Sequence, residues 1–277
     1  MKTLLALALL LNVSPFDQPK MVQYSTIDAF LAGVYNGDLT VGDLKKQGDF
    51  GIGTFNGIDG ELFMLDGEVT QIRAVGNPVP ATDDMLIPFA TFCTFSPGHT
   101  ATLAGPADDE AVYKMIEQRM FPNPNVFYAV ELEGTFTEVI ARAPRKQSSA
   151  DAAISDVIDT QSVFTFQQIE GTMIGFWCPQ FVNGINIGGW HMHFLSKDKT
   201  RGGHVLSFEI GQINVSVMEM MNFEVMLPHE ANYFEANLNL DRAEIRTKIE
   251  QSQVGSHSDQ DAVSAPKNQH PGSPALQ

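Results

Sequence analysis

The sequence predicts an α+β fold of mixed α/β content, in which two domains are built on mixed or antiparallel β-sheets with short helices. Three observations favour this class. Apolar and polar residues alternate in many short segments that are separated by glycine and other turn residues. Helical patterns are few and short, so little chain is available for long parallel crossovers. The 277 residues, of which 43% are hydrophobic, suffice for one large or two modest cores.

Four segments are expected to form short helices. Thr40, followed three residues later by Asp43, has the spacing of a helix cap, and Ser25 or Thr26 can cap an earlier helix. Helices are therefore expected from Ser25 or Thr26 through Tyr35, from Thr40 onward, over residues 108–120 and over residues 151–158.

The strongest hairpin signal is the dipeptide Asp66-Gly67, which separates ELFML from EVTQI. A second hairpin is expected around Glu133-Gly134, between NVFYAVEL and TFTEVIAR. The remaining strand candidates are SVFTFQQI, GTMIGFWC, WHMHFLS, HVLSFEI, INVSVM and FEVMLP.

Changes in composition predict the domain boundaries. The polar stretch 145–159 divides the chain into an N-terminal α/β domain, residues 21–150, and a C-terminal β-rich domain, residues 151–250. Residues 1–20 are expected to form a signal or disordered leader. Residues 251–277 are rich in Ser, Gln, Pro, Asp and His, so a disordered tail is expected there.

The leader has the order of a secretory signal. Lys2 precedes an apolar run from Leu4 to Val13, and a Ser-Pro break follows. This run is too short to span a bilayer, so no integral membrane segment is expected. The segment predicts export; a disordered extension on a cytoplasmic protein is the alternative.

The charge balance excludes several classes of partner. Seventeen Lys and Arg against 33 Asp and Glu give a formal net charge of −16, which repels nucleic acids and anionic lipid surfaces. An acidic small-molecule substrate therefore needs a local cation. Only Cys93 and Cys178 are present, too few for a disulfide framework, and both are expected to be buried thiols.

Three histidines lie close together in GGWHMHFLSKDKTRGGHVLSFEI. On a strand, His191 and His193 leave the same face, and a hairpin over 197–203 returns His204 beside them. Neutral imidazole suits Zn²⁺, and three histidines that leave coordination positions free are typical of a catalytic site. The alternative is that His191 and His193 face solvent while His204 satisfies a turn.

The glycines of GDFGIGTFNGIDGE do not form a phosphate-binding loop. Gly51 and Gly53 give a G-x-G, but no βαβ frame surrounds it and no G-K-[ST] occurs. These glycines instead permit close packing, which lets Thr54 and Glu61 approach a site.

Several segments together resemble one family. They are YSTIDAFLAGVYNGDLTVGDLKKQGDFGIGTFNGIDGEL, IPFATF, NVFYAVELEGTF with ARAPRKQ, GTMIGFWCP and INIGGWHMHFLSKDKTRGGHVLSFEI. From about Gln23 to Glu250 the chain is similar to α-acetolactate decarboxylases. The resemblance implies a two-domain α/β fold with a zinc site between the domains, and conversion of (S)-2-acetolactate to (R)-acetoin and carbon dioxide.

The resemblance also assigns roles to residues. The zinc ligands fall on His191, His193 and His204, two further glutamates near the metal fall on Glu61 and Glu250, the active-site arginine falls on Arg142, and a substrate-binding threonine falls on Thr54. The sequence departs from the family pattern after ARAPRKQ, where SSAD follows, and in the long tail after Glu250.

The substrate explains why these residue types are needed. It is a 2-hydroxy-3-oxo acid, so loss of carbon dioxide leaves an electron pair that delocalises onto the ketone oxygen as an enediolate. A zinc ion would stabilise that charge, which makes an organic cofactor unnecessary. Arg142 can hold the carboxylate or orient the proton, while Glu61 and Glu250 can ligate zinc and manage protons.

The sequence is also compatible with two other classes of function. A zinc hydrolase of cupin-like or carbonic-anhydrase-like type would also use three histidines, with zinc-bound water as the nucleophile. A non-catalytic metal-binding protein would have the same ligands without turnover. The sequence leaves the oligomeric state open, with a homodimer as one option.

Overall fold

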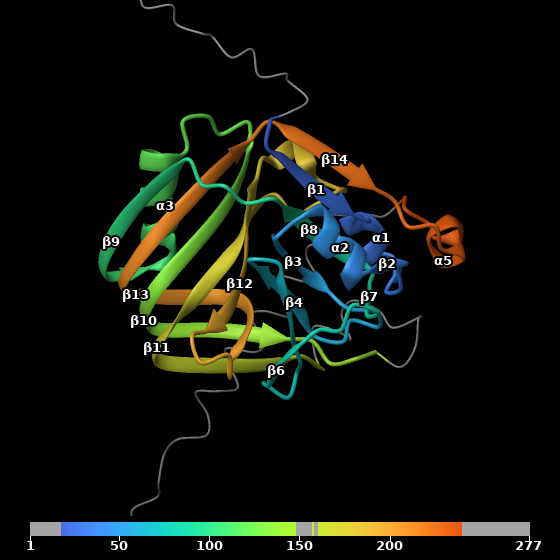
Figure 1. The fold of residues 1–277 in the computed structure, drawn as a ribbon, viewed down its shortest axis with the longest axis horizontal. Coiled ribbons are helices and arrows are strands. Elements are labelled where there is room, and N and C mark those ends of the chain that lie inside the picture. The colour runs from blue at the N-terminus through green and yellow to red at the C-terminus, as the bar shows by residue number, and fades with distance from the viewer. Residues whose placement is uncertain (1–17, 148–156, 158–159, 240–277) are drawn as a thin grey trace, which may run out of the picture. The chain divides into compact units, whose positions relative to one another are not determined.

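The computed structural model describes residues 18–147, 157 and 160–239. Two large β-sheets dominate this part of the chain, and the helices are short (Figure 1). The mostly β architecture with few short helices is therefore confirmed. The leader, the helix expected over 151–158 (except Val157) and the tail lie outside the described residues.

The first sheet has seven strands in the order β14-β1-β8-β3-β4-β5-β6. Its strands are β1 (Lys20–Tyr24), β3 (Phe50–Thr54), β4 (Glu61–Leu65), β5 (Glu68–Ile72), β6 (Pro78–Pro80), β8 (Phe89–Cys93) and β14 (Asn222–Met226). All pairings are antiparallel except that of β1 with β14, so the sheet is mixed. The short strands β2 (Leu39–Thr40) and β7 (Leu86–Ile87) form a separate pair.

The second sheet has five strands in the order β10-β11-β12-β13-β9. Its strands are β9 (His99–Asp108), β10 (Phe127–Ala143), β11 (Ser162–Cys178), β12 (Gly189–Ser196) and β13 (Gly202–Met220). Because β13 pairs with β10 as well as with β12, the pairings β10–β11–β12–β13–β10 close into a ring. The long strands bend strongly to close it (Figure 1).

Three helices were expected in the described part of the chain, and each begins at its predicted cap. They are α1 (Ile27–Leu31), α2 (Val41–Gln47) and α3 (Asp109–Met120), capped by Thr26, Thr40 and Asp108. Helix α1 ends at Leu31 and not at Tyr35, because Gly33 adopts a left-handed φ of 93°. A 3₁₀ turn η2 (Gln180–Val182) and α5 (Ala231–Glu235) complete the described helices.

One predicted hairpin is confirmed and one is wrong. Asp66 and Gly67 have φ values of 53° and 74° and join β4 to β5. Glu133-Gly134, in contrast, lies inside the single strand β10. A Cβ on Gly134 would lie 2.2 Å from the carbonyl oxygen of Gln212, so this glycine permits close approach of β13 and does not make a turn.

Two further pairs of expected strands are also continuous. SVFTFQQI and GTMIGFWC form β11, and HVLSFEI and INVSVM form β13, which has a register shift between Ile210 and Gln212. The sheets also do not divide at residues 145–159. Strands β9 and β10 precede that stretch yet pair with strands that follow it, and β14 near the C-terminal end pairs with β1.

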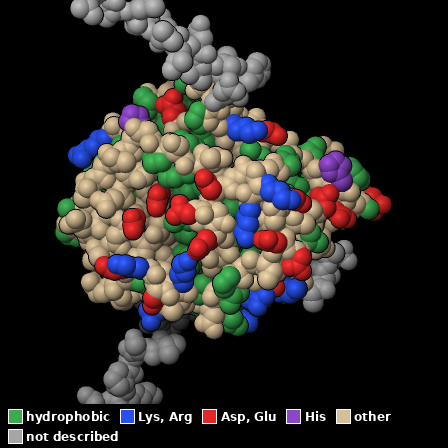
Figure 2. Space-filling view, viewed as in Figure 1, with side chains coloured by type: hydrophobic (Ala, Val, Ile, Leu, Met, Phe, Trp, Pro, Cys, Tyr) green, Lys and Arg blue, Asp and Glu red, His purple; other side chains and the backbone are tan. Residues whose placement is uncertain are grey.

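No helix in the described part of the chain is long and apolar enough to cross a bilayer. On the face seen in Figure 2, acidic and basic side chains are interspersed. Both cysteines are buried free thiols, as expected.

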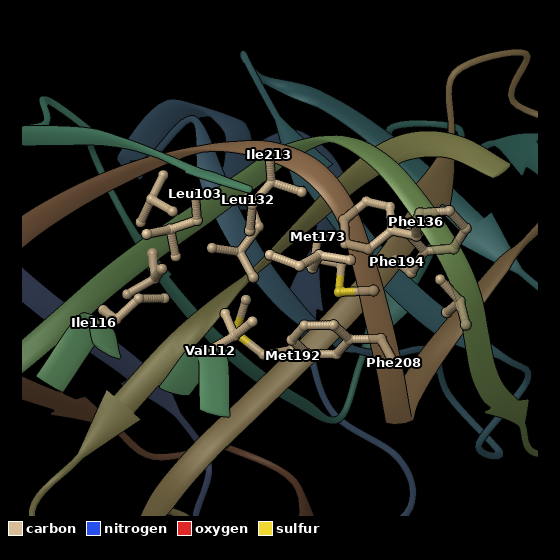
Figure 3. Packing of buried hydrophobic residues seen from close by; sticks show 14 of the residues in the cluster. Leu103, Val112, Ile116, Leu132, Phe136, Met173, Met192, Phe194, Phe208 and Ile213 are labelled. Atoms are coloured by element: carbon tan, nitrogen blue, oxygen red, sulfur yellow. The ribbon is translucent and has the colours of Figure 1, made fainter. Parts of the chain in front are cut away.

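Hydrophobic clusters fill both faces of each sheet. One cluster lies on the face of the five-stranded sheet that α3 covers, and it includes Val112 and Ile116 of the helix (Figure 3). A second joins the two sheets through residues such as Ile52, Phe63 and Leu195. A third packs α2 on the opposite face of the seven-stranded sheet. Strands β4 and β12 therefore face each other across a shared core, and this positions the site.

Candidate metal centre

The three histidines converge on one point. His191 and His193 leave the same face of β12, and the β12–β13 register places His193 opposite His204. The three ring centroids lie 5.2, 4.9 and 5.4 Å apart, so the rings form a nearly equilateral triangle. Their ligand atoms all lie within 4.8 Å of one another. This geometry could hold one metal ion.

The imidazoles are held neutral. Burial lowers the pKa of His193 to about 4, and Arg142 adds to this effect while a hydrogen bond to the backbone opposes it. Burial, with the neighbouring histidines and Arg142, also lowers the pKa of His191 and His204 well below the usual value. Neutral rings offer the lone pairs that a metal requires.

The backbone of β4 orients one of these rings. His193 Nδ1 lies 2.8 Å from the carbonyl oxygen of Leu62 and donates to it. In the neutral ring this leaves Nε2 without a proton and able to bind a metal, which is the usual arrangement of a metal-bound histidine. His193 Nε2 and His191 Nδ1 are buried and have no hydrogen-bond partner among the described residues. Buried polar atoms without partners are rare, so these two nitrogens are candidates to bind a metal.

Glu61 lies beside the histidines at the first residue of β4. Its Oε2 is 3.5 Å from His193 Nε2, and its side chain is 12% exposed. Burial raises the pKa of Glu61 to about 8, although Arg142 acts in the opposite direction. The carboxyl group can therefore exchange a proton near neutral pH.

Arg142 supplies the local cation that the charge balance requires. It lies near the end of β10, opposite His204 in the β10–β13 register. Burial lowers its pKa and Glu61 raises it. Its Nη1 is buried and has no hydrogen-bond partner in the described part of the protein. A guanidinium group in this state is suited to bind an anionic substrate.

Thr54 is brought to the site by its strand, but its hydroxyl group is already engaged. Thr54 pairs with Glu61 in the β3–β4 register and is 5% exposed. Its Oγ1 donates a hydrogen bond of 2.6 Å to the carbonyl oxygen of Gly60. The substrate-binding role expected for Thr54 therefore stays a prediction, as does that of Glu250, which lies outside the described residues.

Two contributions to the site were missed by sequence reasoning. The Leu62 carbonyl group carries no side-chain signal, so no pattern could have predicted it. The close approach of β13 to β10 had a signal in the GGH segment: a Cβ on Gly203 would lie 2.6 Å from the carbonyl oxygen of Arg142.

The chain is similar in sequence and fold to known proteins of one family. A sequence profile of the family described as alpha-acetolactate decarboxylase matches residues 21–240. The alpha-acetolactate decarboxylase of Brevibacillus brevis is 38% identical over 225 residues, which cover 81% of this chain and 79% of that protein. That of Methanosarcina mazei is 37% identical over 230 residues, covering 83% and 80%. The crystal structure of alpha-acetolactate decarboxylase from Bacillus subtilis strain 168 superposes with a TM-score of 0.80 at 35% identity, covering 84% of this chain and 98% of that one.

Proposed function

The chain belongs to the alpha-acetolactate decarboxylase family, and from this premise we propose that it converts (S)-2-acetolactate to (R)-acetoin and carbon dioxide at a zinc ion held by His191, His193 and His204. The observation that carries the proposal is the set of three neutral, converging imidazoles beside one buried carboxyl group and one buried guanidinium group. Together these groups can hold a cation that stabilises developing charge, transfer a proton and bind an anionic keto acid.

The residues present fit a zinc ion. Three imidazole nitrogens and a carboxylate oxygen are donor types that zinc prefers, and buried nitrogens of His191 and His193 have no hydrogen-bond partner among the described residues. We propose that Glu61 and Glu250 add oxygen ligands to the three histidines. When bound, the ion supplies positive charge that stabilises the negative charge developing on the substrate oxygens.

Arg142 binds and orients the substrate. The substrate carries a carboxylate group, and the guanidinium group offers it planar N–H donors in a largely buried setting. Because the protein is strongly acidic overall, this cation also offsets the repulsion that the substrate meets. The bond from the carboxylate group to the carbinol carbon then breaks, and its electron pair delocalises onto the neighbouring ketone oxygen.

Glu61 manages the protons of the reaction. Its carboxyl group lies 3.5 Å from His193, where it can accept and release a proton beside the substrate. The carbanionic carbon left after loss of carbon dioxide must gain one proton, and delivery to a single face gives a single enantiomer. Glu61 and Arg142 are close enough to interact electrostatically, which supports their action on one substrate molecule.

The test is to incubate the purified protein with racemic acetolactate and to measure acetoin by chiral chromatography. The proposal expects (R)-acetoin together with carbon dioxide. His193→Ala is the matched variant, because it removes one ligand and leaves both sheets intact, and it should lose both stoichiometric zinc and turnover. Zinc binding without acetoin would favour a non-catalytic metal-binding role.

A further inference from the structure

The loop of residues 55–60 joins Thr54 to Glu61 and therefore fixes where the Glu61 side chain begins. The backbone is strained at Ile58, whose φ of 53° lies in the left-handed region that β-branched residues rarely adopt. Such a conformation persists only where surrounding contacts hold it. The contacts that hold this loop thus also set the position of Glu61.

Backbone and amide groups anchor the first half of the loop. The Asn56 side chain accepts a hydrogen bond of 2.9 Å from Gly37 N and donates one of 3.0 Å to Gly37 O. Gly57 N donates to Tyr35 O at 2.8 Å, and Gln147 N donates to Gly57 O at 2.7 Å. These hydrogen bonds attach the loop to the segment that follows α1 and to the segment that follows β10.

Asp59 anchors the second half through its charge. Its side chain is 19% exposed, with Oδ1 3.7 Å from Arg73 Nε and Oδ2 3.6 Å from Lys146 Nζ. Its carbonyl oxygen also accepts a hydrogen bond of 2.6 Å from Gln71 Nε2. Arg73 follows β5, whereas Lys146 follows Arg142 by four residues. One carboxylate therefore connects the loop that ends at Glu61 to the segment that carries Arg142.

We propose that Asp59 is a positioning residue that sets the Glu61 carboxyl group relative to Arg142 by bridging Arg73 and Lys146. The inference rests on the proposed function, because it assumes that Glu61 and Arg142 act on the substrate. A residue that only stabilised the fold would change the amount of active enzyme. A positioning residue also changes what each active molecule makes, because a displaced Glu61 delivers its proton less selectively.

The experiment compares Asp59→Ala with Asp83→Ala. Asp83 is the matched control. Its Oδ1 lies 2.8 Å from Nζ of Lys45 in α2, and this ion pair is partly exposed. Three quantities are measured: kcat/KM for acetolactate, the enantiomeric purity of the acetoin formed, and amide hydrogen exchange over residues 54–61 in the metal-free protein. Asp59→Ala is expected to lower kcat/KM about tenfold or more, to reduce enantiomeric purity and to speed exchange in the loop. Asp83→Ala should leave all three at the wild-type level.

The inference is overturned if the Asp59→Ala variant folds and makes acetoin of wild-type enantiomeric purity, even at a lower rate. Wild-type exchange over residues 54–61 overturns it equally. If Asp59→Ala does not fold, Lys146→Met and Arg73→Met each remove one exposed cation and are expected to show the same loss of purity. A wild-type protein that makes no acetoin contradicts the proposed function instead, so the two failures are distinct.

Discussion

At the residue scale, the environment of each side chain decides what it can do. The histidines are neutral because they are buried, and Glu61 holds its proton for the same reason. The sequence predicted that the three histidines converge. Alternate residues of a strand leave the same face, and a hairpin brings the next strand beside the first. It could not predict the pKa of Glu61, because that depends on burial by a strand from the other sheet.

Arg142→Lys is expected to lower kcat/KM by about tenfold or more, because an ammonium group lacks the planar fork that binds a carboxylate at two points. Steady-state kinetics with acetolactate measures this. Arg145→Ala is the control: Arg145 is exposed and donates to the carbonyl oxygen of Thr160, so near-native kinetics are expected. Equal kinetics in Arg142→Lys and the wild type would remove Arg142 from substrate binding.

Glu61 makes the metal-free protein less stable as pH rises. Its pKa is raised from 4.5 to about 8 in the folded state, so the folded protein binds more protons than the unfolded chain in this interval. The free energy of unfolding should therefore fall between pH 6.5 and 8, by about 2 kcal/mol at most at 1.36 kcal/mol per pKa unit. The histidines do not mask this, because their lowered pKa values reduce stability only below about pH 6.5.

Denaturant unfolding of the metal-free protein at several pH values measures this decline. Glu61→Gln should remove most of it, because the amide does not ionise in this pH range. A decline of equal size in Glu61→Gln would show that another group causes it. Added zinc should also reduce the decline in the wild type, since a bound cation favours the carboxylate.

At the element scale, glycine was the residue most easily misread from the sequence. Gly67 makes a turn, whereas Gly134 lies in the middle of a strand, and the two look alike in a pattern of alternating residues. What distinguishes them is that Gly134 pairs with strand β13. That strand is some 80 residues away in sequence, so a local sequence pattern cannot reveal the pairing. For the same reason β11 and β13 were each expected as two strands.

Gly134→Ala is expected to destabilise the protein by about 1–3 kcal/mol, because the added Cβ would lie 2.2 Å from the carbonyl oxygen of Gln212. Thermal or denaturant unfolding provides the measurement. Gly98→Ala is the control, since a Cβ there meets nothing within 4 Å. Similar stability of the two variants would contradict the close approach of β10 and β13.

At the scale of the whole molecule, the site depends on the packing of two sheets. Glu61 and the Leu62 carbonyl group come from the seven-stranded sheet, and the histidines and Arg142 come from the five-stranded sheet. The sequence predicted two sheets and a mostly β fold, but sheet membership follows long-range pairing and not the two halves of the chain. Export remains a prediction, because residues 1–17 lie outside those described.

The segment that follows the described chain is expected to contribute to the site through Glu250. Glu250→Ala in the full-length protein should lose most of the activity, whereas a chain that stops after Gln253 should keep it. Kinetics of the two variants measured side by side provide the contrast. A carboxylate on a solvated surface would change stability by at most about 0.5 kcal/mol and leave turnover unchanged, so an active Glu250→Ala enzyme would remove this residue from the site.

One zinc ion at the histidine cluster is expected to make this chain a decarboxylase. Titration of the metal-free protein with zinc, with acetoin formation from acetolactate measured at each point, tests it most directly. Activity should be absent without metal, rise linearly and saturate at one zinc per chain, and His193→Ala should show no such rise. Full activity in the metal-free protein, or an equal rise in His193→Ala, would contradict the claim.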